Sequence, residues 1–327
     1  MGTEDVFWDA SGYRGCVLND QVSSGVSLIR QTFDWAQIER SRGSYDFSWY
    51  DRLMVALAER RLRVLPILFN APRFRSSGPS GRRRGAHVPR RYGDMGRFAA
   101  RVVRRYGSRG SFWRAHPDLP RVPIRSWQIW NEPNVRVYWP SGPNPREYTR
   151  LLLVVAKEIR KVDRRAEIVT AGIPDSTHGM RLAPFVQGMY RAKAGRSFDT
   201  LAVNGYSSTA AGVPALLNRA RRIMNRNGDR RGRLWLTEFG WSSGGPASRF
   251  RVSREEQARR LSWTLRSLYA SRGRLRLRGA VYYNWRDGKP YPPLFQDFFG
   301  LHTGLIDADR RPKPAYWALR RLAPRLR

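Results

Sequence analysis

Seven short runs of continuous apolar, β-prone residues recur along the chain and are separated by longer segments with helical periodicity. The runs cover residues 25–30, 63–70, 124–130, 167–172, 200–206, 233–238 and 279–285. Continuous apolar runs are typical of parallel strands that helices cover on both faces, whereas half-exposed strands alternate apolar and polar residues. The pattern therefore predicts an α/β fold built on a parallel sheet.

The segments between these runs carry helix start signals followed by apolar stripes at helical spacing. Serine or asparagine with a nearby acid is typical of a helix N-terminus, and proline is favoured at the first helical position. A helix over 92–106 that ends before Gly107 is expected as well. The other predicted starts are Ser48 with Asp51, Asn144 with Pro145, and Ser253 with Glu256.

An eighth strand is needed to close a barrel of this kind. The best candidate is residues 5–8, and the stretch 13–24 that should hold the first helix is short and poorly periodic. We therefore expect residues 1–327 to form a single-domain (β/α)8 TIM barrel whose first βα unit is weak or irregular. The segment 73–91, rich in Gly and Arg, is expected to be a long, mobile, basic loop. It is either a functional loop on the rim or a plain surface loop.

The chain is strongly basic, with 61 Lys and Arg residues against 26 Asp and Glu residues and a net charge of +35. A charge of this size favours polyanionic partners. However, the arginine pairs are scattered along the sequence and form no stripe, which argues against a dedicated nucleic-acid surface. A carbohydrate partner, acidic glycans included, remains compatible with the charge.

Other classes of site are disfavoured by composition. Cys16 is the only cysteine and the four histidines are far apart, so neither a disulfide nor a metal or cofactor site is expected. The apolar runs are too short for a transmembrane segment. No leader with a basic start and an apolar core opens the chain, and nothing in the sequence indicates an oligomeric state.

Two of the apolar runs end in a glutamate followed by a residue that breaks the strand. They read Trp-Gln-Ile-Trp-Asn-Glu-Pro at 127–133 and Leu-Trp-Leu-Thr-Glu-Phe-Gly at 234–240. In a parallel barrel all carboxyl strand ends meet on one rim, where active sites form. Glu132 and Glu238 would then face each other. Most glycoside hydrolases use such a pair of carboxyl groups for catalysis.

These motifs resemble those of clan A glycoside hydrolases, and families 5 and 39 in particular. Asn131-Glu132-Pro133 after a Trp-rich strand matches the first motif, and the second is Thr237-Glu238-Phe239-Gly240-Trp241. The resemblance extends to 25–47, with Arg30 at the end of a strand, and to a closing segment at 304–316. It covers about residues 25 to 322 and implies a retaining enzyme that cleaves β-glycosidic bonds in oligo- or polysaccharides. It also implies an extracytoplasmic location.

The resemblance implies a role for each matching residue. Glu132 would be the general acid/base and Glu238 the nucleophile, while Asn131 would bind the sugar 2-hydroxyl. Arg30 and Tyr206 would hold Glu238 ionised and oriented. The remaining substrate-binding candidates are aromatic: Trp285 as the floor beneath the cleaved sugar, with Trp139 and Trp241 at neighbouring subsites or in loop packing.

One position departs from the pattern, because related enzymes often have histidine where this chain has Asn204, two residues before Tyr206. Two alternative functions also stay open at this point. The chain could be a basic protein that binds nucleic acid or another polyanion, or a catalytically silent barrel that binds glycans. The scattered arginines disfavour the first alternative, and the intact pair of glutamates disfavours the second.

Overall fold

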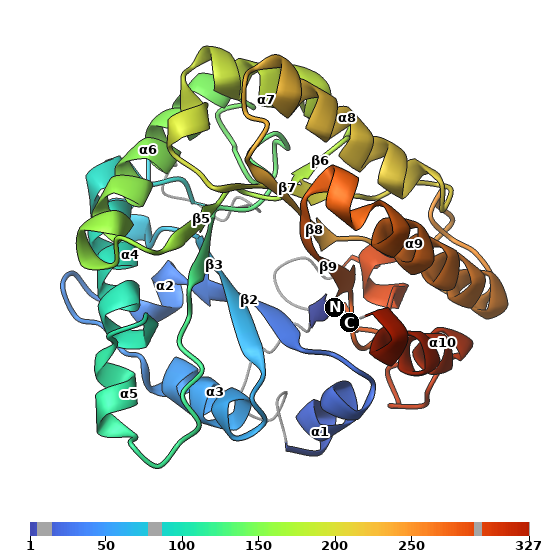
Figure 1. Ribbon diagram of the computed structural model, residues 1–327. Helices are drawn as coiled ribbons and strands as arrows, with labels where there is room; N and C mark the ends of the chain where they lie inside the picture. The colour runs from blue at the N-terminus through green and yellow to red at the C-terminus, as the bar shows by residue number, and fades with distance from the viewer. Residues whose placement is uncertain (5–14, 78–86, 291–295, 327) are drawn as a thin grey trace.

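The computed structural model describes residues 1–4, 15–77, 87–290 and 296–326 of the 327-residue chain. Within these ranges, a closed, all-parallel barrel of eight strands is surrounded by helices (Figure 1). The segments β5 and β6 follow each other and both pair with β7, so they act as one interrupted strand. The pairing of β5 with β7 closes the barrel, which confirms the predicted fold class.

The strands agree with the seven predicted runs, with shifted ends. Their bounds are β1 Gly2–Glu4, β2 Leu28–Asp34, β3 Arg63–Phe69, β4 Ser126–Ile129, β5 Glu167–Val169, β6 Ile173–Pro174, β7 Thr200–Asn204, β8 Arg233–Glu238 and β9 Leu277–Tyr283. The largest shift is in β2, which continues through the polar residues Gln31 and Thr32 that ended the apolar run. The predicted strand at 5–8 lies outside the described residues, and the first strand of the barrel is β1, immediately before it.

The helices occupy the segments between the strands. Their bounds are α1 Gly15–Ser23, α2 Trp35–Ile38, α3 Ser48–Glu59, α4 Tyr92–Tyr106, α5 Ser111–Ala115, α6 Pro145–Val162, α7 Leu182–Arg191, α8 Gly212–Arg226, α9 Arg254–Leu275 and α10 Pro314–Leu322, with short 3₁₀ turns at Arg73–Arg75, Ala194–Arg196, Phe299–His302 and Ala323–Leu326. No helix of the described part is both long and apolar enough to cross a bilayer.

Two of the three predicted caps are confirmed by hydrogen bonds. The Asn144 Oδ1 atom accepts from the backbone N–H groups of Arg146 and Glu147, and the Ser253 Oγ atom accepts from that of Glu256. The prediction for Ser48 is wrong because α3 begins at Ser48 itself. Its backbone N–H donates to Asp46 Oδ1 at 2.9 Å instead.

The partner predicted for Ser48 has another role. Asp51 accepts hydrogen bonds from Tyr106 Oη at 2.6 Å and from Arg105 Nε at 2.7 Å, and both residues lie on α4. Asp51 therefore ties α3 to α4 and takes no part in a cap.

The loop predicted at 73–91 is described only at its two ends. Ser76 and Pro89 form an antiparallel bridge, and Arg75 forms an ion pair with the fully buried Glu39. Trp35 Nε1 also donates to Glu39, at 2.6 Å. The described ends of this basic segment are therefore fixed to the loop after β2.

The interior of the barrel has an apolar layer with a polar layer above it. Six residues from six strands form a separate buried cluster: Leu28, Leu65, Val169, Ala202, Trp235 and Val281. Side chains two residues apart on a strand point to the same face. The positions two residues after Leu28, Ala202 and Val281 are therefore the next layer, and they are Arg30, Asn204 and Tyr283. The apolar layer thus forms the floor beneath a polar rim.

The closing segment of the barrel is held by a buried ion pair. The Nζ atom of Lys313 lies 2.5 Å from Asp287 and donates to Ser243 Oγ at 2.9 Å. The Lys313 side chain is 1% exposed and that of Asp287 is 12% exposed. Asp287 and Lys313 both lie in the segment that follows β9, whereas Ser243 lies in the loop that follows β8.

Replacing Lys313 with Met is expected to lower the free energy of unfolding by about 3 kcal/mol, because it leaves the Asp287 carboxylate buried without its charge partner. Urea denaturation of the variant measures this loss. The control is Lys161→Met, whose side chain is 57% exposed in its pair with Glu158 and which should cost less than about 1 kcal/mol. Equal losses in the two variants would contradict a structural role for the buried pair.

Candidate active site

Arg30 is the centre of a hydrogen-bond network at the carboxyl end of the barrel. Its guanidinium is fully buried and donates from Nε to Gln128 at 2.8 Å, from Nη2 to Asn131 Oδ1 at 2.9 Å and from Nη1 to Glu238 at 2.6 Å. Nη1 also forms an ion pair with Glu4. Burial lowers the pKa of Arg30, but the two carboxylates outweigh it and raise the pKa above its ordinary value.

Glu238, the last residue of β8, is held by two donors. Its Oε1 atom accepts from Arg30 and its Oε2 atom accepts from Tyr206 Oη at 2.8 Å. The residue is only 6% exposed, so both hydrogen bonds lie away from bulk water. Burial, with Glu238 as the largest charge contribution, raises the pKa of Tyr206 well above its ordinary value, so the phenol remains a donor.

Glu132 lies in a turn of unusual backbone geometry after β4. Trp130 has φ +73° and Glu132 has φ +44°, in the left-handed region that residues other than glycine rarely occupy. Hydrogen bonds fix this turn: Trp130 N donates to Leu68 O, and Glu132 N donates to Gly172 O at 3.2 Å. Such strained positions cluster at functional sites, where the surrounding structure holds them.

The environment of Glu132 favours its neutral form. Burial and the nearby charge of Glu238 raise the pKa of Glu132 to about 8, although a hydrogen bond from Asn204 and the charge of Arg30 oppose this. The two glutamates therefore have contrasting surroundings. Glu238 is bound by a cation and a phenol, whereas burial and a neighbouring carboxylate favour the neutral form of Glu132.

Asn204, the position that departs from the related enzymes, contacts Glu132. Its Nδ2 atom donates to Glu132 Oε1 at 2.7 Å, and its Oδ1 atom accepts from Thr237 Oγ1 at 2.8 Å. Because Thr237 binds the amide oxygen, the amide nitrogen faces Glu132. A side chain at Gly172 would collide with Asn204, since its Cβ atom would lie 2.1 Å from Oδ1. The Asn204 amide therefore connects Thr237, the residue before Glu238, to Glu132 through two hydrogen bonds.

Five of the eight predicted site residues, Arg30, Asn131, Glu132, Tyr206 and Glu238, are brought together in this network, and the other three are fully buried tryptophans. Trp139 donates from its ring to Glu147 at 3.2 Å, and Trp241 donates to Ser207 O at 2.8 Å. Both rings lie in the main apolar core, so of the two alternatives for them the structure agrees with packing. Trp285 is also 0% exposed, and it packs against Tyr316. Tyr283 is one of three partly exposed rings near Tyr206, together with Phe250 and Phe299.

Sequence reasoning missed Glu4 and Gln128. Glu4 pairs in register with Arg30 on one side and with Tyr283 on the other, so it belongs to the same rim as Glu238. A carboxylate at a strand end was a usable signal, but the first strand was expected at 5–8. Gln128 is fully buried within β4 and is fixed by donating to Thr170 O at 3.1 Å, a contact that no local pattern indicates.

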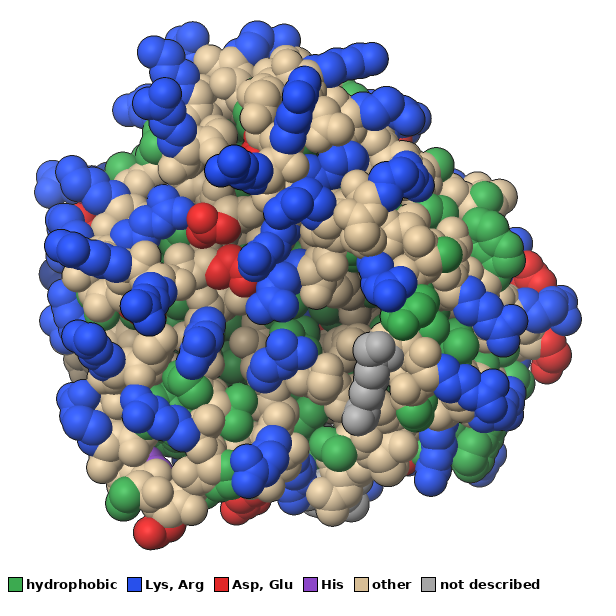
Figure 2. All heavy atoms as spheres, in the orientation of Figure 1, with side chains coloured by type: hydrophobic (Ala, Val, Ile, Leu, Met, Phe, Trp, Pro, Cys, Tyr) green, Lys and Arg blue, Asp and Glu red, His purple; other side chains and the backbone are tan. Residues whose placement is uncertain are grey.

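Positive charge covers the protein broadly. On the face shown in Figure 2, Lys and Arg side chains lie over nearly every element and form no single stripe, in agreement with the scattered arginine pairs of the sequence. In the described ranges, no group of three or more His, Cys, Asp or Glu residues is arranged to hold a metal ion.

Comparison with known proteins supports the fold. No protein-family model and no curated sequence matches the chain. Among solved structures, a family 39 glycoside hydrolase from Bacteroides cellulosilyticus WH2 has a TM-score of 0.72 at 19% identity, covering 99% of this chain and 63% of its own. A monomeric β-xylosidase from Caulobacter crescentus CB15 has a TM-score of 0.73 at 17% identity, with coverages of 98% and 67%.

A third structure, the GH39 enzyme from Xanthomonas axonopodis pv. citri, has a TM-score of 0.72 at 16% identity and covers 99% of this chain and 66% of its own. The chain spans less than two thirds of the length of the first of these proteins. The resemblance drawn from the two glutamate motifs is thus matched at the level of architecture: the chain has the (β/α)8 barrel fold of these glycoside hydrolases.

Proposed function

We propose that the protein is a retaining glycoside hydrolase that cleaves β-linked saccharides, with Glu132 as general acid/base and Glu238 as nucleophile. The observation that carries this proposal is the contrast between the two carboxyl groups at the carboxyl ends of β4 and β8. Two donors hold Glu238, whereas burial and the charge of Glu238 raise the pKa of Glu132. A carboxyl group whose surroundings favour the neutral form suits the general acid of such a pair.

The reaction has two steps. In the first, a carboxylate oxygen of Glu238 bonds to the anomeric carbon while the glycosidic C–O bond breaks and the proton of Glu132 passes to the leaving oxygen. In the second, Glu132 takes a proton from water as the water oxygen attacks the anomeric carbon, and the bond to Glu238 breaks. The sugar is released with its original anomeric configuration.

The surrounding residues suit these steps. Arg30 and Tyr206 orient Glu238 and balance the charge that returns to it when the intermediate breaks down. Arg30 also binds Asn131 Oδ1, which leaves the Asn131 amide nitrogen to donate to the sugar 2-hydroxyl. Tyr283, beside Tyr206 and partly exposed, supplies an aromatic surface at the same rim.

Similar structures support a β-linked substrate. Besides the β-xylosidase, they include an exo-β-1,4-mannosidase from Opitutaceae bacterium strain TAV5 and a β-galactosidase from Halorubrum lacusprofundi. Their names differ in the sugar and share the β configuration, so we propose β-linkage and leave the sugar to experiment.

The proposal is tested by incubating the protein with aryl β-glycosides and β-linked polysaccharides while proton NMR follows the anomeric signals. The expected result is hydrolysis in which the first product carries the β configuration. A first product of α configuration would indicate inversion and contradict the assigned roles, as would the absence of hydrolysis across neutral and acidic sugars.

Asn204→Leu is expected to move the alkaline limb of the activity profile upward by about one pH unit. The change removes the donor that stabilises ionised Glu132, and a hydrogen bond to a charged group contributes about 1.5–3 kcal/mol. The measurement is the pH dependence of kcat/KM. Thr237→Val serves as a matched variant with a smaller shift, because it frees the amide to rotate but keeps the donor. If the alkaline limb of Asn204→Leu lay at the same pH as that of wild type, the Asn204 amide would not stabilise ionised Glu132.

A further inference from the structure

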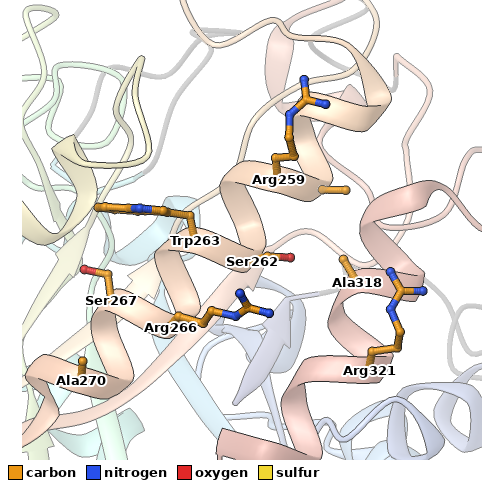
Figure 3. Close-up of a pocket in the computed structure, with 9 residues that line it drawn as sticks. Arg259, Ser262, Trp263, Arg266, Ser267, Ala270, Ala318 and Arg321 are labelled. Carbon is orange, nitrogen blue, oxygen red and sulfur yellow. The ribbon is translucent and has the colours of Figure 1, made fainter.

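A shallow groove lies on the outside of the barrel, over α9 and beside α10, which pack side by side (Figure 3). Its volume is about 710 Å³. The residues that matter for its chemistry are Arg259, Ser262, Trp263, Arg266 and Ser267 from α9, and Arg321 from α10. None of them belongs to the network around Arg30.

The outer face of α9 carries an aromatic ring between two arginines. Arg259, Trp263 and Arg266 are spaced i, i+4 and i+7, so they share one face of the helix. The buried residues Leu261 and Leu268 lie on the opposite face. Trp263 is 48% exposed, and among the described tryptophans only Trp317 is comparably uncovered. Its ring extends from α9 on the side away from α10 (Figure 3), so Trp263 and the arginines lie on opposite flanks of the groove.

The groove also holds guanidinium groups without partners. Arg266 and Arg321 extend from the two helices toward the space between them, and neither has an ion pair or hydrogen bond to any residue of the described ranges. Arg259, in contrast, forms an ion pair with Glu256 at 2.9 Å. Two unpaired cations that face one groove repel each other, and a bound anion would relieve this repulsion.

The combination of groups selects a class of ligand. The flat apolar face of a sugar ring can stack on Trp263, and guanidinium groups bind carboxylates with two parallel hydrogen bonds. The hydroxyls of Ser262 and Ser267 suit sugar hydroxyl groups. Single-stranded nucleic acids need successive aromatic rings for successive bases, and Trp263 is the only ring that lines this groove among the described residues.

The groove leads away from the catalytic rim. Because α9 follows the loop after Glu238, its first turns lie on the rim side, and the helix descends along the barrel from Arg254 to Leu275. The stretch from Arg259 to Ala270 spans about 17 Å at the helical rise per residue. A polymer held there would extend outward from the barrel mouth.

We propose that this groove binds a stretch of acidic polysaccharide, of the polyuronate kind, as a site separate from the catalytic pair. This inference rests on the proposed function, because it takes the bound polymer to be the substrate of the hydrolase, which would then be an acidic polysaccharide. Binding at the groove is nevertheless measured without turnover, so the two proposals can fail separately.

The test uses isothermal titration calorimetry of the full chain carrying Glu238→Ala, with oligogalacturonate as the probe. Trp263→Ala and the pair Arg266→Gln/Arg321→Gln are each expected to weaken binding about tenfold or more. Trp317→Ala is the matched control, since Trp317 is 45% exposed on α10 but does not line the groove. The exposed pair Arg164→Gln/Arg165→Gln controls for loss of charge alone, and both controls should bind within twofold of the parent.

Three results would overturn the inference: no binding by the parent at low salt, equal losses in the groove variants and the controls, or equal affinity for the methyl-esterified, uncharged probe. Oligothymidylate that binds as tightly and depends on Trp263 would assign the groove to nucleic acid and also overturn it. Turnover of small aryl glycosides is measured separately on otherwise wild-type protein, where Trp263→Ala should leave it unchanged. Retained binding without any hydrolysis refutes the proposed function alone, and hydrolysis without groove binding refutes the groove alone.

Discussion

Replacing Glu238 with Ala is expected to reduce kcat by at least about 10⁴-fold, because the covalent intermediate can no longer form. The loss should be similar for activated and unactivated substrates, since both need the same nucleophile. Rates of release from aryl β-glycosides and reducing-sugar assays on polysaccharides measure it. A residual rate within about tenfold of wild type would contradict the role of Glu238.

The control for this variant is a partly buried carboxylate at the opposite end of the barrel. Glu167 begins β5 and accepts hydrogen bonds from Ser126 and Thr200, both at 2.6 Å. Glu167→Gln also removes a hydrogen-bonded, partly buried charge, so it should lower stability while kcat stays near that of wild type. The comparison separates loss of the nucleophile from general damage to the barrel.

Replacing Glu132 with Gln is expected to lower kcat/KM by about 10²–10⁴-fold on substrates with poor leaving groups, because proton transfer to the leaving oxygen is lost. Substrates with good leaving groups should be affected less in the first step. The wild-type rate should fall as the pH rises through the raised pKa of Glu132, near 8, and this alkaline limb should vanish in Glu132→Gln. A limb that persists in the variant would assign the titration to another group.

The raised pKa of Glu132 also predicts how the stability of the folded protein changes with pH. Because the pKa of Glu132 is higher in the folded protein than in the unfolded chain, the folded state binds the proton more tightly, and stability falls as the pH rises from the ordinary glutamate range toward 8. Glu132→Gln should therefore be more stable than wild type at pH 8, and the difference should shrink near pH 4. Urea midpoints at the two pH values measure it.

The sequence was most informative where one local pattern determined the outcome. Continuous apolar runs marked the strands, and the glutamates at the ends of two runs marked the rim, because the carboxyl ends of parallel strands converge. Helix α4 was predicted with the bounds it has, since its apolar stripe ends at Gly107. Asn144 was predicted as a cap because its short amide side chain competes well for free N–H groups at a helix start.

The errors came from contacts between distant segments. The role of Asp51 depends on Arg105 and Tyr106, more than fifty residues away, so the local spacing to Ser48 suggested a cap that does not form. For Trp139 and Trp241 the sequence left subsites and packing open, because only tertiary contacts determine that both rings are buried. Glu4 and Asn204 acquired their partners only through the closure of the barrel.

The most direct measurement of the central claim is to trap the intermediate. A 2-deoxy-2-fluoro glycoside with a good leaving group slows the second step, so the protein should gain the mass of one fluorosugar, and peptide mass spectrometry should place it on Glu238. Glu238→Ala should gain no mass under the same conditions. A label on Glu132 or Glu4, or steady hydrolysis with no covalent adduct, would contradict the assignment of Glu238 as the nucleophile.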